Sequence, residues 1–293
     1  MLNKHFDTNG IDILEVRAGR QWEHIDVYVE VNTNQGNYLI VIEDKTFTRN
    51  SVGQLERYLV CGENWCRQYN AQLCCVYVKT GSESQKKLTA IRKKGFEPFT
   101  RGEFIEILDH FPENNSDILT DFRSRLHQLQ RAHDAFLTKP IGKWNNECWI
   151  GFYQFLEREM GIVDWDLVNP PGGGQFWNAV LNWEYWHGFP VYLQIEQGKL
   201  CFKISHVDSE IEDYGRSEIR NKWHRVILSA ATDQQIKAIR KPDRFGTGDY
   251  MTCAMVDRHN WLGKTDEFFD AAVVVERLRH YKFFLKSLLT VSR

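Results

Sequence analysis

The sequence has little proline, no long apolar run and no apolar leader segment. Only 7 of its 293 residues are proline, and 42% apolar with 26% charged residues is typical of a globular chain rather than a disordered one. The longest apolar runs, such as Tyr38 to Ile42, are too short to cross a bilayer. Residues 1–20 contain several charged side chains and no apolar core, so we expect no secretory signal.

Disulfide spacing and an excess of basic charge are also missing. The 7 cysteines are an odd number without CxxC spacing, so reduced thiols in a cytoplasmic protein are the simplest interpretation. Nucleic-acid-binding proteins are usually basic, because phosphate contacts supply much of their affinity, but the net charge here is -2. Residues 1–140 hold 18 Lys and Arg against 19 Asp and Glu, and residues 141–293 hold 19 against 20. Composition by itself is mild evidence against a nucleic-acid partner.

The order of apolar patterns predicts two domains with a boundary near residue 140. In residues 1–140, strands come first and then alternate with helices, which is typical of an α/β or α+β sandwich with a mixed sheet. The expected strands are 12–16, 24–31, 38–42 and 73–79, and the expected helices are 51–68, 82–94, 102–110 and 117–137. Because the first strand begins by about residue 12, we expect no long helix before it.

Residues 141–293 predict a second α+β domain that is rich in tryptophan. Eight of the 10 tryptophans lie there, and most are expected to be core residues. Helices are expected at 145–160, 212–240 and 265–290, with strands at 175–185, 190–196, 199–205 and 249–257. Recognition, sensing and oligomerisation are the roles we expect for this domain.

The first candidate site lies on the hairpin formed by the strands 24–31 and 38–42. Asp26 and Glu43 are equally far from a turn centred between Asn34 and Gln35, so they face each other in an antiparallel pair. His24 and Lys45 are opposed in the same way. Alternation then places all four side chains on one face of the sheet.

Two opposed carboxylates repel each other unless a cation compensates their charge. Mg²⁺ or Mn²⁺ suits this position, because these ions prefer oxygen ligands and often use one or two carboxylates plus water. Lys45 would then lie beside the ion and a scissile phosphate, where it could orient a water or stabilise developing charge. The alternative interpretation of Asp26, Glu43 and Lys45 is a surface ion-pair cluster.

The following helix contributes Gln54 and Tyr58, which lie four residues apart and therefore on one helix face. They favour a site that extends from the strand ends to this helix. Two structural interpretations stay open, because Ser51 to Gln54 also fits a capping box and Tyr58 could be a core residue.

Together, Glu15, Ile25-Asp26, Glu43-Asp44-Lys45 and Gln54-x-x-x-Tyr58 resemble the PD-(D/E)XK nuclease superfamily, in the branch that has an added Gln-x-x-x-Tyr motif. Ile25 stands where the family name has proline. The resemblance implies a restriction-endonuclease-like mixed sheet flanked by helices, and metal-dependent hydrolysis of nucleic-acid phosphodiesters.

The resemblance also assigns roles to these residues. Asp26, Glu43 and the backbone carbonyl of Asp44 would bind the metal, and Lys45 would assist the attacking water. Gln54 and Tyr58 would orient groups of the site or the nucleic-acid backbone. Glu15 would be an auxiliary acid, with an exposed strand-end charge as the alternative.

Partners follow from the same interpretation. DNA is expected rather than RNA, and a role in bacterial or phage-related defence follows from the resemblance alone. A local basic cluster could contact phosphates, although a solvated helix face explains it equally well; it consists of Lys86, Lys87, Arg92, Lys93 and Lys94. A homodimer and a protein partner of the C-terminal domain are further expectations. The competing hypothesis is a catalytically inactive nuclease fold that binds nucleic acid or protein.

Overall fold

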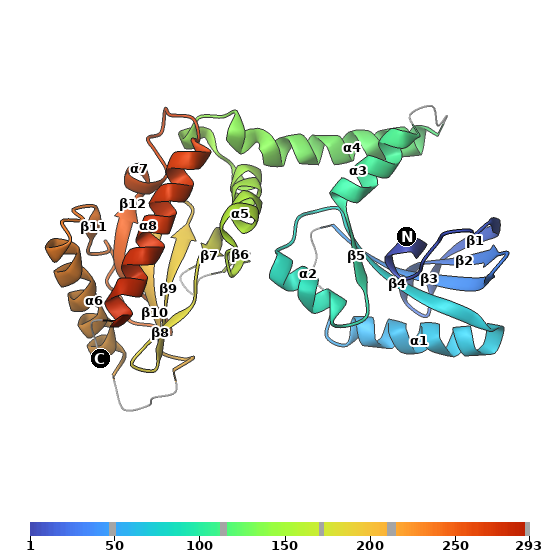
Figure 1. The fold of residues 1–293 in the computed structure, drawn as a ribbon, viewed down its shortest axis with the longest axis horizontal. Coiled ribbons are helices and arrows are strands. Elements are labelled where there is room, and N and C mark those ends of the chain that lie inside the picture. The colour runs from blue at the N-terminus through green and yellow to red at the C-terminus, as the bar shows by residue number, and fades with distance from the viewer. Residues whose placement is uncertain (47–50, 112–115, 170–172, 210–214, 291–293) are drawn as a thin grey trace. The chain divides into compact units, whose positions relative to one another are not determined.

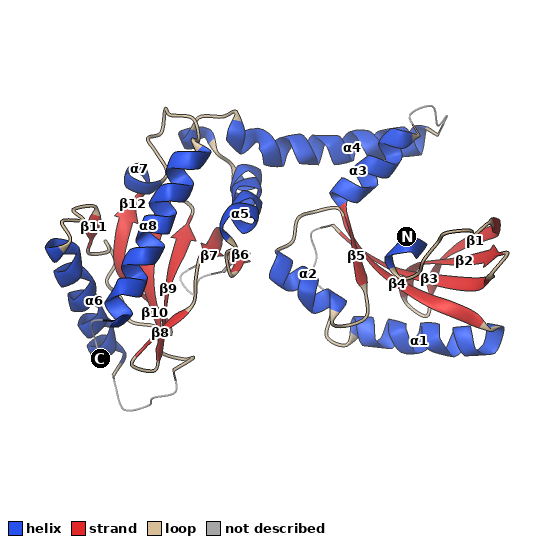
Figure 2. Ribbon diagram, in the orientation of Figure 1, coloured by secondary structure: helices blue, strands red, loops and turns tan. Residues whose placement is uncertain are grey.

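The computed structural model describes residues 1–46, 51–111, 116–169, 173–209 and 215–290, which form a mixed α/β structure with two separate sheets (Figures 1 and 2). The chain divides into two compact units, Met1–Arg131 and Ala132–Arg293. The division lies within helix α4 (Asp117–Asp134), earlier than the boundary expected near residue 140. The reason is that Phe136, in the 3-10 turn just after α4, is buried in the core of the second unit.

The sheet of the first unit has five strands in the order of the chain. The first three strands are antiparallel neighbours, whereas the last two join in parallel after helical crossovers. These strands are β1 (Ile13–Trp22), β2 (Ile25–Thr33), β3 (Gly36–Lys45), β4 (Ala71–Lys79) and β5 (Glu97–Thr100). The helices of this unit are α1 (Gln54–Tyr69), α2 (Gln85–Arg92), α3 (Arg101–His110) and α4.

The predicted hairpin register is confirmed. Thr33 pairs with Gly36 and Val27 with Ile42, which centres the turn between Asn34 and Gln35. Two details differ from expectation. His24 is a turn residue with φ 66° rather than a strand residue, because β1 continues to Trp22 and returns through a tight turn. The sequence also gave no sign of β5, a four-residue edge strand that contains Pro98.

Both faces of this sheet are packed, which explains why Tyr38 to Ile42 is apolar throughout. Leu39 and Val41 join Leu55 and Tyr58 of α1 in one core. Tyr38, Ile40 and Ile42 join a second core on the opposite face, together with Leu2 and Phe99. A 3-10 turn, Leu2–Lys4, is the helical structure before β1 in the described chain. Because β3 is covered on both faces, a charge at its end is placed next to low-dielectric surroundings.

The second unit contains an antiparallel sheet with the order β11-β12-β10-β9-β7-β6, and β8 also pairs with β9. Its strands are β6 (Asp164–Val168), β7 (Phe176–Val180), β8 (Glu184–Trp186), β9 (Phe189–Glu196), β10 (Lys199–Ser205), β11 (Ile239–Arg240) and β12 (Tyr250–Asp257). Its helices are α5 (Asn146–Met160), α6 (Arg216–Asp233), α7 (Arg258–Trp261) and α8 (Ala271–Thr290). Trp149, Trp165, Trp186, Trp223 and Trp261 are buried in its core, as expected.

One helix of the second unit ends earlier than predicted. The helix expected over 212–240 is α6, which stops at Asp233, and residues 212–214 lie outside the described chain. Ile239 and Arg240 pair with β12 as β11, because a buried β12 offers a free edge there. Nowhere in the described chain does a helix combine the length and apolar character that crossing a membrane requires.

Candidate active site

The candidate site is centred on Glu43, which lies near the end of β3 and is 0% exposed. Its Oε1 atom forms an ion pair with the ammonium of Lys45 and accepts a hydrogen bond of 2.8 Å from Gln54 Nε2. Its Oε2 atom is buried and has no hydrogen-bond partner among the described residues. A buried carboxylate oxygen without a donor costs free energy, and such a position is typical of a group that binds a ligand or a cation.

Asp26 lies at the start of β2, and the paired residues Val27 and Ile42 are the direct neighbours of Asp26 and Glu43 along the two strands. The two carboxyl groups interact with each other. The Oδ2 atom of Asp26 accepts a hydrogen bond of 3.1 Å from the backbone N–H of Asp44. The charge of Asp26 raises the pKa of both Glu43 and Asp44, although burial is the larger cause in each case. The two predicted metal-binding carboxylates are therefore neighbours, and the backbone of Asp44 lies next to them.

Gln54 connects the strand ends to α1. Its Nε2 atom donates to Glu43 and also to Tyr58 Oη, at 3.0 Å, while Tyr58 donates its own proton to the backbone carbonyl of His24. The capping-box alternative is wrong, because the N-cap residue of α1 is Gly53, with φ 71° and no side-chain cap hydrogen bond. The Ser51 N–H does donate to Gln54 Oε1 at 3.2 Å, so Gln54 contacts the preceding turn with one end of its amide and Glu43 with the other.

The charges within the site balance only in part. Burial raises the pKa of Glu43, the Lys45 ion pair opposes that rise, and Asp26 adds to it. Burial lowers the pKa of Lys45, but contact with Glu43 and the charge of Asp26 outweigh this effect and raise the pKa overall. Lys45 therefore stays protonated, and one ammonium faces two carboxylates.

Glu15 is not brought to this cluster. It pairs with Asn32, which is at the opposite end of β2 from Asp26. Its side chain is 51% exposed and forms a 2.9 Å ion pair with Arg17. The exposed-charge alternative describes its position in the structure.

The predicted basic cluster is mostly ion-paired within the first unit. Lys87 contacts Glu83 at 3.1 Å, Arg92 contacts Glu97 at 3.3 Å, and Lys94 contacts Glu56 at 2.9 Å. These pairs are partly exposed, so phosphates could compete for the same cations. The cluster is therefore less basic than its sequence indicates.

Lys79 is a site residue that the sequence reasoning missed. It pairs with Lys45 in the parallel register of β3 and β4, is only 4% exposed, and contacts Glu83 at 3.4 Å. Burial lowers its pKa, and the charges of Lys87 and Lys45 lower it further. The available signal was that both apolar strands end in lysine, because the ends of parallel neighbouring strands meet. Lys79 links the site to α2.

Asp26 and Glu43 are the side chains of this site that could hold a divalent cation. Within the described ranges, no three or more His, Cys, Asp or Glu side chains form a group that could hold a metal ion. Mg²⁺, however, is commonly bound by one or two carboxylates and completes its shell with water. Asp26, together with the unpartnered Oε2 of buried Glu43, supplies such a pair. The Asp44 carbonyl stays a predicted third ligand.

Comparisons with protein-family models, curated proteins and solved structures find no match to this chain.

Proposed function

We propose that residues 1–140 form the core of a metal-dependent nuclease with a restriction-endonuclease-like fold, which hydrolyses phosphodiester bonds with Mg²⁺ or Mn²⁺. The observation that carries the proposal is the fully buried Glu43, whose Oε2 has no donor among the described residues while Asp26 adds a second negative charge. Buried carboxylate oxygens usually have a partner, and an oxygen without one that lies beside a second carboxylate supports a cation as the missing partner.

In this proposal, Asp26 and Glu43 hold the cation, which supplies positive charge that polarises the scissile phosphate. Gln54 holds Glu43 at a fixed rotamer through its 2.8 Å hydrogen bond, and Tyr58 locks Gln54 in turn. Lys45 keeps its proton because the carboxylates raise its pKa, so it stabilises negative charge that develops on the phosphate.

DNA is the proposed substrate rather than RNA, and both the preference and a defence role rest on the family resemblance. Lys79 and Lys87 both contact Glu83, so basic side chains continue from the strand ends to α2, where the partly exposed Lys87 could contact phosphate. The net charge of -2 is compatible with such a protein, because a bound cation adds charge that composition omits. A cytoplasmic location is part of this proposal, and the proposed role of the second unit is recognition, sensing or oligomerisation.

Cleavage of nucleic acid tests the proposal directly. Linear and circular duplex DNA, single-stranded DNA and RNA are incubated with Mg²⁺ or Mn²⁺ and wild-type protein, Lys45→Ala or Lys264→Ala. Lys264 is a control because its side chain is 72% exposed in the other unit. We expect metal-dependent cleavage by wild type and Lys264→Ala, and a loss of about a hundredfold or more in Lys45→Ala. Equal cleavage by Lys45→Ala, or none by wild type, contradicts the proposal.

One observation favours a second candidate, a nuclease fold that binds nucleic acid or protein without turnover. Lys45 contacts Glu43 directly and so compensates part of the buried charge without any cation. The same assay separates the two, because a binding module would retain DNA in a mobility-shift measurement and leave it uncut with either metal.

A further inference from the structure

Strand β1 forms an edge of the first sheet, and its outer side has no partner strand in the described chain. Apolar side chains on it are exposed: Ile13 at 60%, Leu14 at 66% and Val16 at 55%. An exposed apolar edge strand is a template for pairing with another strand. Nearly every residue from Ile13 to Trp22 is exposed, so the whole edge is accessible within this unit.

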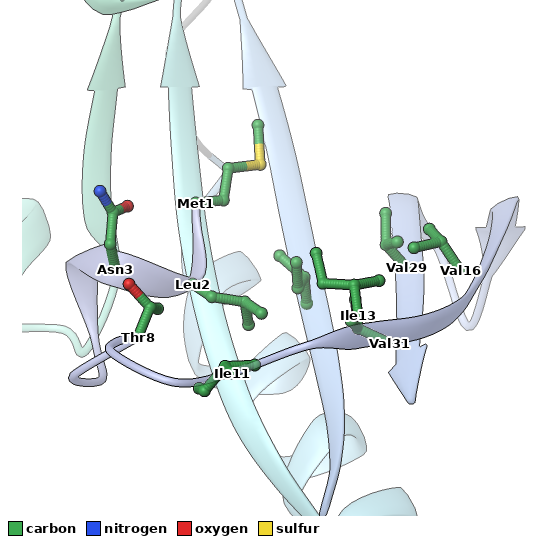
Figure 3. A pocket seen from close by; sticks show the side chains of 10 residues that line it. Met1, Leu2, Asn3, Thr8, Ile11, Ile13, Val16, Val29 and Val31 are labelled. Carbon is green, nitrogen blue, oxygen red and sulfur yellow. The ribbon is translucent and has the colours of Figure 1, made fainter. Parts of the chain in front are cut away.

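An apolar groove lies beside this edge, on the face opposite α1. Figure 3 shows Ile13 and Val16 of β1 next to Val29 and Val31 of β2, with Leu2 and Ile11 on the far side. The apolar surface therefore continues from the sheet to the edge strand. A partner that extends the sheet would cover this surface as well as the free backbone groups of β1.

The charges of β1 indicate which partner fits. Two copies of one strand that pair antiparallel in a single sheet are related by a two-fold axis perpendicular to the sheet. This axis passes midway between one residue and the same residue of the other copy. When the axis passes through Val16, Glu15 faces Arg17 of the partner copy, and this pair occurs twice. An axis through Glu15 would oppose two acids, and an axis through Arg17 or Arg20 would oppose two arginines.

From this self-complementarity we infer that β1 is an interface for a second copy of this chain, paired antiparallel about Val16 to give one continuous sheet. The inference does not depend on the proposed nuclease function. A register shift between Ile13 and Glu15 in the β1–β2 pair shortens the regular ladder, and Glu15 to Arg17 lie within the regular part. Because a two-fold axis perpendicular to the sheet does not exchange its two faces, α1 of both copies lies on the same side of the continuous sheet.

Charge reversal tests the interface. Self-association is measured by sedimentation equilibrium across micromolar concentrations for wild type, Arg17→Glu and the swapped variant Glu15→Arg/Arg17→Glu. Arg17→Glu opposes acids twice and should weaken the dimer about tenfold, and the swap should restore it. Arg67→Glu is the matched control, since Arg17 and Arg67 are 71% and 73% exposed and each contacts a glutamate in its own chain.

A crosslink tests the register independently. In a Cys61→Ser background, Val16→Cys places two thiols at the axis, where paired Cα atoms are about 4.5–5.5 Å apart. An added mild oxidant, which takes up the two electrons and two protons, should convert these thiols to a disulfide. Ala18→Cys places them about 13 Å apart along the strands and should not crosslink. Both positions are exposed, and circular dichroism is used to check that each variant is folded. Monomeric wild type, a dimer insensitive to Arg17→Glu, or equal crosslinking at both positions would overturn the inference.

Discussion

Removal of the ammonium of Lys45 should destabilise the protein far more than removal of a surface lysine. Lys45→Met keeps the aliphatic part of the side chain but removes the ammonium that pairs with Glu43. The Glu43 side chain is 0% exposed and would then keep the hydrogen bond from Gln54. Removing one partner of a buried pair costs about 3–5 kcal/mol. Because the Lys45 side chain is 14% exposed, we expect about 3 kcal/mol, near the lower end of that range.

Urea denaturation without divalent ions, followed by circular dichroism, measures this change in the free energy of unfolding. Lys94→Met is the matched control, because its ion pair with Glu56 is 44% and 52% exposed and should contribute less than about 1 kcal/mol. The double variant Glu43→Gln/Lys45→Met removes both charges, and most of the lost stability should return.

Added Mg²⁺ gives a second measurement that does not depend on catalysis. Lys45→Met leaves the Asp26 and Glu43 carboxylates with less compensation, so it should bind the cation more tightly than wild type. At a free concentration about a hundredfold above Kd, binding adds about 2.7 kcal/mol of stability. The reasoning is refuted if Lys45→Met is as stable as Lys94→Met without metal, or if Mg²⁺ stabilises the double variant as much as Lys45→Met.

Three other predictions concern the same unit. Burial raises the pKa of Glu43, so the metal-free protein loses stability as the pH rises from the ordinary glutamate pKa through the raised value. Glu43→Gln removes this loss, and urea titrations at several pH values should show that the stability of the variant relative to wild type grows with pH. Tyr58→Phe removes the bonds to Gln54 and His24 and should cost about 1 kcal/mol and reduce cleavage severalfold, whereas Tyr69→Phe on the same helix, at a 51% exposed position, should change neither. If α2 contacts phosphates, Lys87→Gln should lower the salt dependence of DNA affinity by about one unit of slope, as fluorescence anisotropy at several salt concentrations would show.

The sequence by itself determined the hairpin and the register that opposes Asp26 and Glu43. Strand alternation has a period of two and the turn residues are local, so equal distances from Asn34–Gln35 place the carboxylates correctly. Helix geometry is equally local: residues four apart lie on one face of α1, and the hydrogen bond between Gln54 and Tyr58 follows from that spacing.

Tertiary structure alone decided how the strand ends combine. Lys79 meets Lys45 because β4 is the parallel neighbour of β3, and no local pattern fixes which strands become neighbours. The same holds for Glu15, since the length of β1 depends on its pairing with β2 and places the acid far along the strand from Asp26. Burial of Glu43 is also a property of the assembled sheet and helix, and it turns an ordinary strand-end charge into the buried, partly unpartnered carboxylate at the centre of the proposed site.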